Sequence, residues 1–240
     1  NIQIFALSIT LLFPIFNFFL IYDVITREFS FKNYQEDIHL GSLILLLSVF
    51  LYFFFISDLG FSNVFFAITS SISTSGISTY SSNFDLSLFF ILLTFIGGSL
   101  ISTSSGFKYT RIYILFKISY QEIYRLVKPI NIVDKNLYNS ENKIDNEDVK
   151  IAFLVFIFFL ISIFILSSIL TFDYLTFENS FKLSILTLTN TVSSSLYGVD
   201  NFSFLDLNNF TKMSLIFFMI LGKIEIIALI YLLRKFIFRE

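Results

Sequence analysis

A short polar tract carries the residue types that could bind a cation inside a membrane. It reads Thr74, Ser75, Gly76, Ile77 and Ser78, and it lies in the stretch FFAITSSISTSGIST between two long apolar runs. Backbone carbonyl oxygens of an extended tract can replace the hydration shell of a cation, and glycine tolerates the φ angles that this requires. We predict an ion filter here, with an external Ser/Thr-rich loop as the alternative.

Residues 61–73 precede this tract and are predicted to form a short helix. About 13 residues extend roughly 20 Å, which is too short to cross a bilayer core of about 30 Å. Irregular backbone at membrane depth persists only where protein buries it or where it lines a wet cavity. A helix that enters the membrane and returns would aim the negative end of its dipole at the cavity, and this favours a cation.

The same pattern occurs a second time in the chain. Residues 177–190 form a second helix that is too short to cross, and the polar sequence TVSSSLYGVDN follows it. The corresponding filter residues are Thr191, Val192 and Ser193. A single Ser/Thr-rich tract is common in external loops, whereas two tracts in matching positions of two repeats favour a pore.

Another Gly/Ser/Thr-rich stretch, GGSLISTSSG, interrupts the apolar segment at residues 86–118. Such a stretch cannot form a lipid-facing helix with its backbone satisfied, so we predict a loop inside a wet cavity below the filter. The alternative is a kinked helix whose Ser and Thr side chains bond to backbone carbonyls. Lys108 and Arg111 follow, where basic residues anchor the inner face of a membrane protein.

Lys223 is predicted near the middle of a long helix at residues 209–238. At roughly 20 Å from either end, its ammonium group cannot reach the membrane surface. A cation inside a membrane faces water or a partner, so we expect Lys223 to face the pore and to lower cation occupancy beneath the filter. The alternative is a structural pair with Glu225 or with a carboxylate of another repeat.

The elements that position these residues are membrane spans. The 240 residues are 55% hydrophobic and 14% charged, whereas soluble domains average about 25% charged. We predict an all-α polytopic membrane protein: one N-terminal transmembrane helix at residues 2–21, kinked at Pro14, and two membrane–pore-helix–membrane repeats. The predicted units are 1–37, one pore repeat at 38–118 with its filter and loop, a cytoplasmic linker at 119–148, and another pore repeat at 149–240.

Residues 39–57 and 151–172 are predicted to begin the two repeats as uninterrupted spans. Thirteen of the 16 Lys and Arg residues lie in segments that we place inside, and Lys182 and Lys212 lie outside. This bias follows the positive-inside rule and puts both polar tracts at the outer mouth. The chain has no Cys, a single His and a net charge of −2. We expect neither an enzyme nor a nucleic-acid-binding protein, because no span combines metal ligands or a nucleophile with a base.

The order and spacing of these motifs resemble the C-terminal half of the TrkH/KtrB/HKT superfamily of potassium transporters, over about residues 38–238. FFAITSSISTSGIST resembles the third pore helix and filter, LTLTNTVSSSLYGVDNF the fourth filter, and MILGKIEIIALIYLL the last helix. The most specific match is FIGGSLISTSSGFKYTRI, which resembles the gating-loop signature of that family. Its matching residues are Gly97, Gly98, Ser102, Thr103, Ser105, Gly106, Lys108 and Arg111.

This resemblance implies four repeats around one path for potassium, with the intramembrane loop as its gate. By this match residues 2–21 would be the last helix of the second repeat. Since two repeats cannot enclose the path alone, we expect missing N-terminal repeats or a second copy. The chain begins with Asn rather than Met, so we expect it to be processed or cut from something longer.

The resemblance also implies a multi-pass protein of the cell (inner) membrane that forms a homodimer within the lipid. A cytosolic nucleotide-binding regulatory subunit would contact Lys108 and Arg111 to open the gate. No cofactor is expected in this chain, and K+ would be the transported ion.

Three positions depart from the family pattern. Val192 stands at or near a filter glycine, and a β-branched residue resists positive φ; in the family, a non-Gly filter residue implies weaker preference for potassium over sodium. Ser105 and Gly106 replace a Gly-Gly pair. Lys223 replaces an arginine, which keeps the charge and loses the bidentate fork. A broken-helix transporter for another solute, and a non-conducting fragment or relative, remain alternatives.

Overall fold

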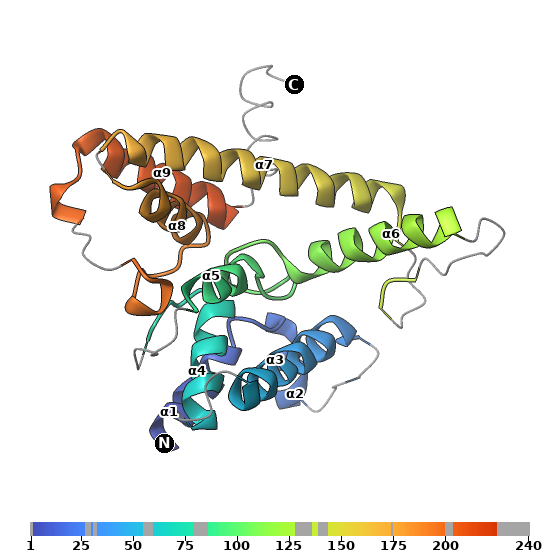
Figure 1. The fold of residues 1–240 in the computed structure, drawn as a ribbon. Helices are drawn as coiled ribbons and strands as arrows, with labels where there is room; N and C mark the ends of the chain where they lie inside the picture. The colour runs from blue at the N-terminus through green and yellow to red at the C-terminus, as the bar shows by residue number, and fades with distance from the viewer. Residues whose placement is uncertain are drawn as a thin grey trace.

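A computed structural model describes residues 2–26, 30, 33–54, 60–78, 86–127, 136–138, 144–173, 175–199 and 204–224. Within these ranges the regular structure is helical, apart from one isolated bridge between Ile96 and Phe107 (Figure 1). The elements are α1 Ile2–Leu12, α2 Phe18–Thr26, α3 Gln35–Phe54, α4 Phe61–Ile72, α5 Ser87–Phe95, α6 Tyr109–Val127, α7 Asn146–Thr171, α8 Phe177–Leu188, η2 Ser195–Tyr197, η3 Phe204–Asp206 and α9 Asn209–Ile224. The predicted all-α class is confirmed.

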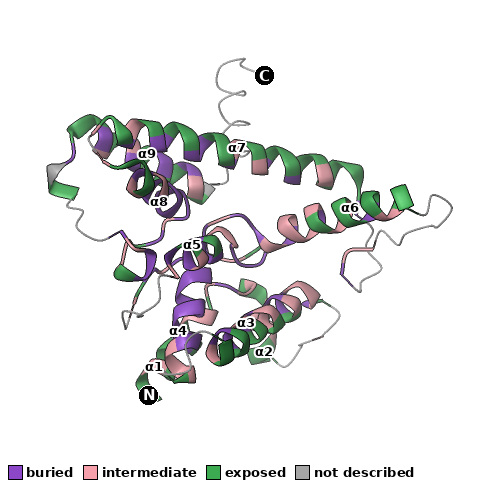
Figure 2. Cartoon of the chain, viewed as in Figure 1, coloured by how far each residue is buried: buried purple, intermediate pink, exposed green. Residues whose placement is uncertain are grey.

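Two helices in the described ranges are long and apolar enough to cross a membrane, namely α3 with 20 residues and α7 with 26. Both correspond to predicted spans, and Figure 2 shows long exposed faces on both. Those faces carry large apolar side chains such as Phe53 and Phe164, as expected for helices whose outer surface meets lipid. The second half of the predicted helix at 209–238, with Glu225, lies outside the described residues.

The predicted repeat is visible in the order of the helices. A long helix, a short buried helix and a polar tract occur as α3–α4 and again as α7–α8, and a further helix follows each tract. The short helices α4 and α8 have 12 residues each. Helices α7, α8 and α9 lie together on one side, and α5 lies between them and α4 (Figure 1).

The short helices are buried by the long ones. Residues 64–72 of α4 and 182–188 of α8 are all buried, and α4 contacts α1, α3 and α5 whereas α8 contacts α7, α9 and α5. Gly60 is the N-cap of α4, and α4 has no side-chain capping bond. A short apolar helix in the middle of a protein is thereby shielded from lipid at its sides.

The predicted single N-terminal helix is wrong. Helix α1 ends at Leu12 and α2 begins at Phe18, so neither half is long enough to cross a bilayer core of about 30 Å. Pro14 lacks the N–H that would continue the helix, and the Asn17 side chain accepts the N–H of Phe19 to begin α2. We call residues 13–17 the α1–α2 junction.

Helix α6 extends into the predicted linker. It continues to Val127, nine residues into the predicted linker, because no glycine or proline interrupts it. Part of the linker packs back on the helices: Ile144 joins Ile114 and Ala152 in a small apolar cluster, and Tyr138 stacks on Tyr113 at 4.3 Å between ring centroids.

Candidate functional site

The first polar tract folds back on the end of α4. The backbone N–H groups of Ser75 and Gly76 both donate to the carbonyl of Ser70, at 3.1 and 3.3 Å. The Ser70 hydroxyl donates to the carbonyl of Ile77 at 2.7 Å. Ser70 therefore holds both sides of the tract, and residues 74–78 keep one defined path although they form no helix or strand.

Gly76 satisfies the backbone condition expected for a filter glycine. Its φ is +72°, in the region that side chains disfavour. A Cβ at this position would lie 2.3 Å from the Val192 carbonyl oxygen and 2.7 Å from the Val192 nitrogen. The two polar tracts, far apart in the sequence, therefore lie directly side by side.

The second tract repeats the geometry of the first, with one difference. Thr74 and Asn190 occupy the same place after their short helices, and their φ angles are +59° and +54°. Two residues later the counterpart of Gly76 is Val192, which is not among the residues with positive φ. Its side chain is 63% exposed and borders a cavity of about 250 Å³ between α8 and α9. Val192 therefore occupies the same place after α8 as Gly76 does after α4.

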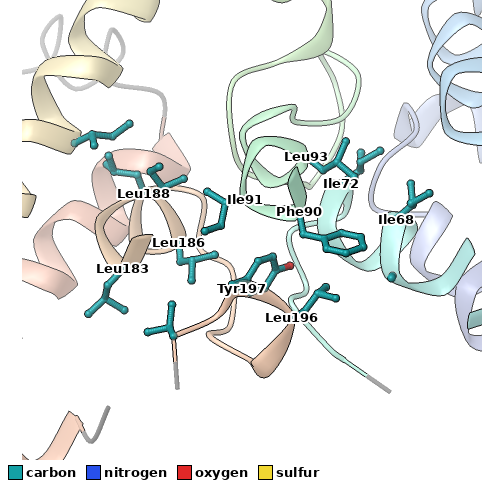
Figure 3. Packing of buried hydrophobic residues seen from close by; sticks show 14 of the residues in the cluster. Ile68, Ile72, Phe90, Ile91, Leu93, Leu183, Leu186, Leu188, Leu196 and Tyr197 are labelled. Atoms are coloured by element: carbon teal, nitrogen blue, oxygen red, sulfur yellow. The ribbon is translucent and has the colours of Figure 1, made fainter. Parts of the chain in front are cut away.

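A buried tyrosine joins the segment after the second tract to the short helix before the first tract. Tyr197 of η2 is fully buried and lies between Leu186 of α8 and Phe90 of α5 (Figure 3). Its hydroxyl donates to Ser71 of α4 at 3.4 Å. Lys182 of α8 donates to the Gly198 carbonyl at 3.4 Å, which ties the segment after the second tract to its own short helix.

Residues 96–107, which we call the intramembrane loop, are irregular rather than a kinked helix. Gly97 N–H donates to the Phe107 carbonyl at 2.9 Å, and Phe107 N–H donates to the Phe95 carbonyl at 3.0 Å. These bonds join the ends of the loop beside α5. A Cβ on Gly98 would lie 2.2 Å from the Ile15 carbonyl oxygen, so glycine allows the loop to approach the α1–α2 junction.

Two lysines hold the carbonyl groups of the intramembrane loop. Lys108 is 8% exposed and donates to the carbonyls of Ser102 and Ser104 at 3.0 and 2.9 Å. Lys223 reaches across from α9 and donates to the Thr103 carbonyl at 2.6 Å. Three consecutive carbonyls therefore bind ammonium groups, and in this way two elements hold the loop in place.

The loop also contacts the first polar tract. Ser105 N–H donates to the Thr74 hydroxyl at 3.3 Å, so the first residue of the tract is hydrogen-bonded to the loop. Thr103 binds Lys223 through its carbonyl, and Gly106 has a φ of +87°. Arg111 lies half-buried in the first turn of α6, and its backbone N–H donates to the Lys108 carbonyl at 3.0 Å.

Comparison with known proteins identifies the family of this chain. The sequence profile of a family described as TrkH, cation transport protein, matches residues 61–238, which include both tracts, the intramembrane loop and Lys223. The chain belongs to the TrkH family of cation transport proteins. It is therefore a transporter-family, multi-pass membrane protein, as predicted, and not a member of an enzyme family.

Two TrkH-family proteins are similar along most of the chain. The Trk system potassium uptake protein TrkG of Escherichia coli (strain K12) is 32% identical over 243 residues, which cover 94% of this chain and 48% of TrkG. The crystal structure of the potassium transporter TrkH from Vibrio parahaemolyticus shares the fold, with a TM-score of 0.80 at 23% identity over 94% of this chain and 50% of that one. The chain spans about half the length of these relatives.

The structure adds two carboxylates that the sequence analysis missed in this TrkH-family chain. Glu36 Oε1 accepts the N–H of Leu100 in the intramembrane loop at 2.9 Å. Asp37 Oδ1 accepts the N–H of Asn17 in the α1–α2 junction at 2.8 Å. Both residues lie just before the span predicted at residues 39–57, and the sequence analysis gave them no role. The signal that could have found them is an acidic pair at the start of a span whose next 17 residues carry no Asp, Glu, Lys or Arg.

Proposed function

We propose that this chain forms half of a path for potassium (a monovalent cation) across the membrane, in which residues 74–78 and 191–193 line an ion filter. The observation that carries the proposal is the contact between Gly76 and Val192, since it brings two separate polar tracts to one place. Both tracts follow the C-terminal ends of buried short helices, where the helix dipole favours a cation. The potassium uptake named for TrkG supports K+ as the transported ion.

The intramembrane loop is proposed as the gate of this path. It lies against the base of the first tract through Ser105 and Thr74, and Lys108 and Lys223 occupy its carbonyl groups. An ammonium group that binds these carbonyls also places a positive charge where a permeating cation must pass. Release of the loop from its lysines would therefore both widen the path and lower the electrostatic barrier.

A conducting form of this protein needs more than these 240 residues. Since it spans about half the length of its relatives, further repeats or a second copy would complete the wall of the path. We propose a homodimer in the cell (inner) membrane, with a cytosolic nucleotide-binding subunit that acts on the loop through Lys108 and Arg111. Val192 at a filter position favours a path with relaxed selectivity for potassium over sodium.

Growth rescue tests this function. The chain in its natural reading frame is expressed in cells that lack potassium uptake, beside a Gly76→Asp variant at the same membrane level. We expect the natural protein to restore growth at low potassium, and the variant to fail because its side chain would collide with the Val192 backbone. Equal rescue by both would show that the filter is assigned to the wrong residues, and no rescue by either would favour a non-conducting relative.

A further inference from the structure

The intramembrane loop is joined to a second irregular segment, the α1–α2 junction. Ser99 N–H donates to the Ile15 carbonyl at 2.9 Å, and Ser104 N–H donates to the Pro14 carbonyl at 3.0 Å. Both donors belong to the loop and both acceptors belong to the junction. These two bonds pair N–H groups of the loop with carbonyl groups of the junction. Such groups have no partner within a helix at these positions, and lipid could not supply one.

The first turn of α3 binds both irregular segments. Glu36 accepts the N–H of Leu100 in the loop, and the adjacent Asp37 accepts the N–H of Asn17 in the junction. Asp37 is 4% exposed. Hydrogen bonds from N–H groups to carboxylates are roughly twice as strong as those between neutral groups. Glu36 and Asp37, which are neighbours on one turn of α3, thus bind the intramembrane loop and the α1–α2 junction to the same helix end.

The N–H groups and the carbonyl groups of the loop therefore have different kinds of partner. Its N–H groups at Ser99, Leu100 and Ser104 point to junction carbonyls and to a carboxylate, whereas its carbonyls at Ser102, Thr103 and Ser104 bind lysine ammonium groups. The lysine contacts explain one side of the loop. The α3 carboxylates hold the other side, and that side has no part in the function proposed above.

We propose that Glu36 and Asp37 are positioning residues that hold the intramembrane loop and the α1–α2 junction as one unit, fixed to the inner end of α3. The consequence for transport rests on the proposed gating function: the loop cannot leave the path unless it breaks its bond to α3 or moves with it. In this role both carboxylates act through the two segments that they bind.

The cytoplasmic linker lies two hydrogen bonds away from this contact. The Tyr138 hydroxyl donates to Thr110 at 3.4 Å, and the Thr110 hydroxyl is hydrogen-bonded to the Glu36 carboxylate. Tyr138 also stacks on His39 of α3, with 5.2 Å between ring centroids. A movement of the linker at Tyr138 would therefore change contacts with the turn of α3 that binds the loop.

The contact can be removed from either side. Glu36→Ala removes the acceptor, and Leu100→Pro removes the donor. Leu100 follows Ser99, whose carbonyl accepts the N–H of Ser102 at 3.1 Å, so it is the second residue of a turn, a place that proline favours. Glu36→Gln keeps an acceptor oxygen and serves as the conservative variant. Glu122→Ala removes an exposed carboxylate of α6 that pairs with Arg125 and serves as the matched control.

Loop position is read by labelling, which does not depend on transport. These 240 residues contain no Cys, so Ser105→Cys adds the one thiol in this part of the protein, and any cysteine elsewhere in the natural-length protein is first replaced by serine. Ser105 is buried and its hydroxyl has no partner in the described structure, which makes this a mild change. The natural-length protein in vesicles is treated with a water-soluble maleimide, and radioactive rubidium uptake is measured on the same preparations.

We expect Glu36→Ala and Leu100→Pro each to increase the labelling rate and the rubidium uptake severalfold. The Glu36→Ala/Leu100→Pro double variant should label and transport at nearly the same rate as either single variant, because both changes remove the same hydrogen bond. Glu36→Gln and Glu122→Ala should stay within about twofold of the parent. Unchanged labelling in both Glu36→Ala and Leu100→Pro would overturn the proposal. Increased labelling with unchanged uptake would support the positioning role and refute the gating function on which its consequence rests.

Discussion

Lys223→Gln should raise cation flux through the path. Lys223 extends from α9 to the Thr103 carbonyl at 2.6 Å, and its side chain is otherwise exposed on the described surface. Glutamine is shorter and neutral, so it loses the contact with the loop and the positive charge in the path. Both losses act in the same direction, since one releases the loop and the other lowers repulsion of the ion.

The size of the effect follows from the hydrogen bond. A bond from a charged donor contributes about 1.5–3 kcal/mol when it is shielded from water. Because Lys223 is exposed, we take about 1 kcal/mol. At about 1.4 kcal/mol for each factor of ten, the open population of the loop should rise about fivefold. Loss of repulsion adds to this, so about fivefold is the lower bound for the increase in flux.

Radioactive rubidium uptake into vesicles, normalised to the amount of inserted protein, measures the change. Lys212→Gln is the matched control, because Lys212 lies on the same helix and donates to Leu205 at the other end, at 3.1 Å. Lys223→Arg keeps the charge and should leave flux within about twofold. Unchanged or reduced flux in a correctly inserted Lys223→Gln protein would refute the reasoning. An increase of equal size with Lys212→Gln would assign the effect to net charge alone.

The remaining predictions concern the filter and the packing around it. Val192→Gly should increase the preference for potassium over sodium in competition uptake, and unchanged preference would remove Val192 from the filter. Gly222→Ala should lower the melting temperature in detergent by an amount equivalent to about 1–3 kcal/mol, because its Cβ would lie 1.8 Å from a carbonyl oxygen of α8; Gly41→Ala, with only ordinary contacts, should not lower it. Thr74→Val leaves the buried N–H of Ser105 without its acceptor, and the same melt should show a cost of about 1–3 kcal/mol.

Local composition explains which parts of the site could be predicted. The short helices, the two polar tracts and the break at residues 96–107 depend on how apolar each stretch is and on where glycine, serine and threonine gather. Gly76 was found because positive φ favours glycine, and the structure has that φ. The placement of Val192 at a filter position came from the resemblance to the family, and the structure has Gly76 and Val192 at equal places after two helices of 12 residues each.

One prediction failed because it depended on how far a helix continues. Pro14 was expected to kink one span, but the chain leaves the helix there and the Pro14 carbonyl accepts a hydrogen bond from the N–H of Ser104. A partner 90 positions away in the sequence is therefore part of this break, and local composition does not indicate such a partner.

The sequence by itself determined the membrane class, the repeated order of long and short helices, and the residues suited to a filter and a loop, because each of these is a property of neighbouring residues. The tertiary structure alone decided that Gly76 lies against Val192, that Lys223 binds Thr103, and that Glu36 holds Leu100. These pairs join residues 64 or more positions apart, and such a contact leaves no periodic pattern in the chain. Its partners are specified only when the helices have packed.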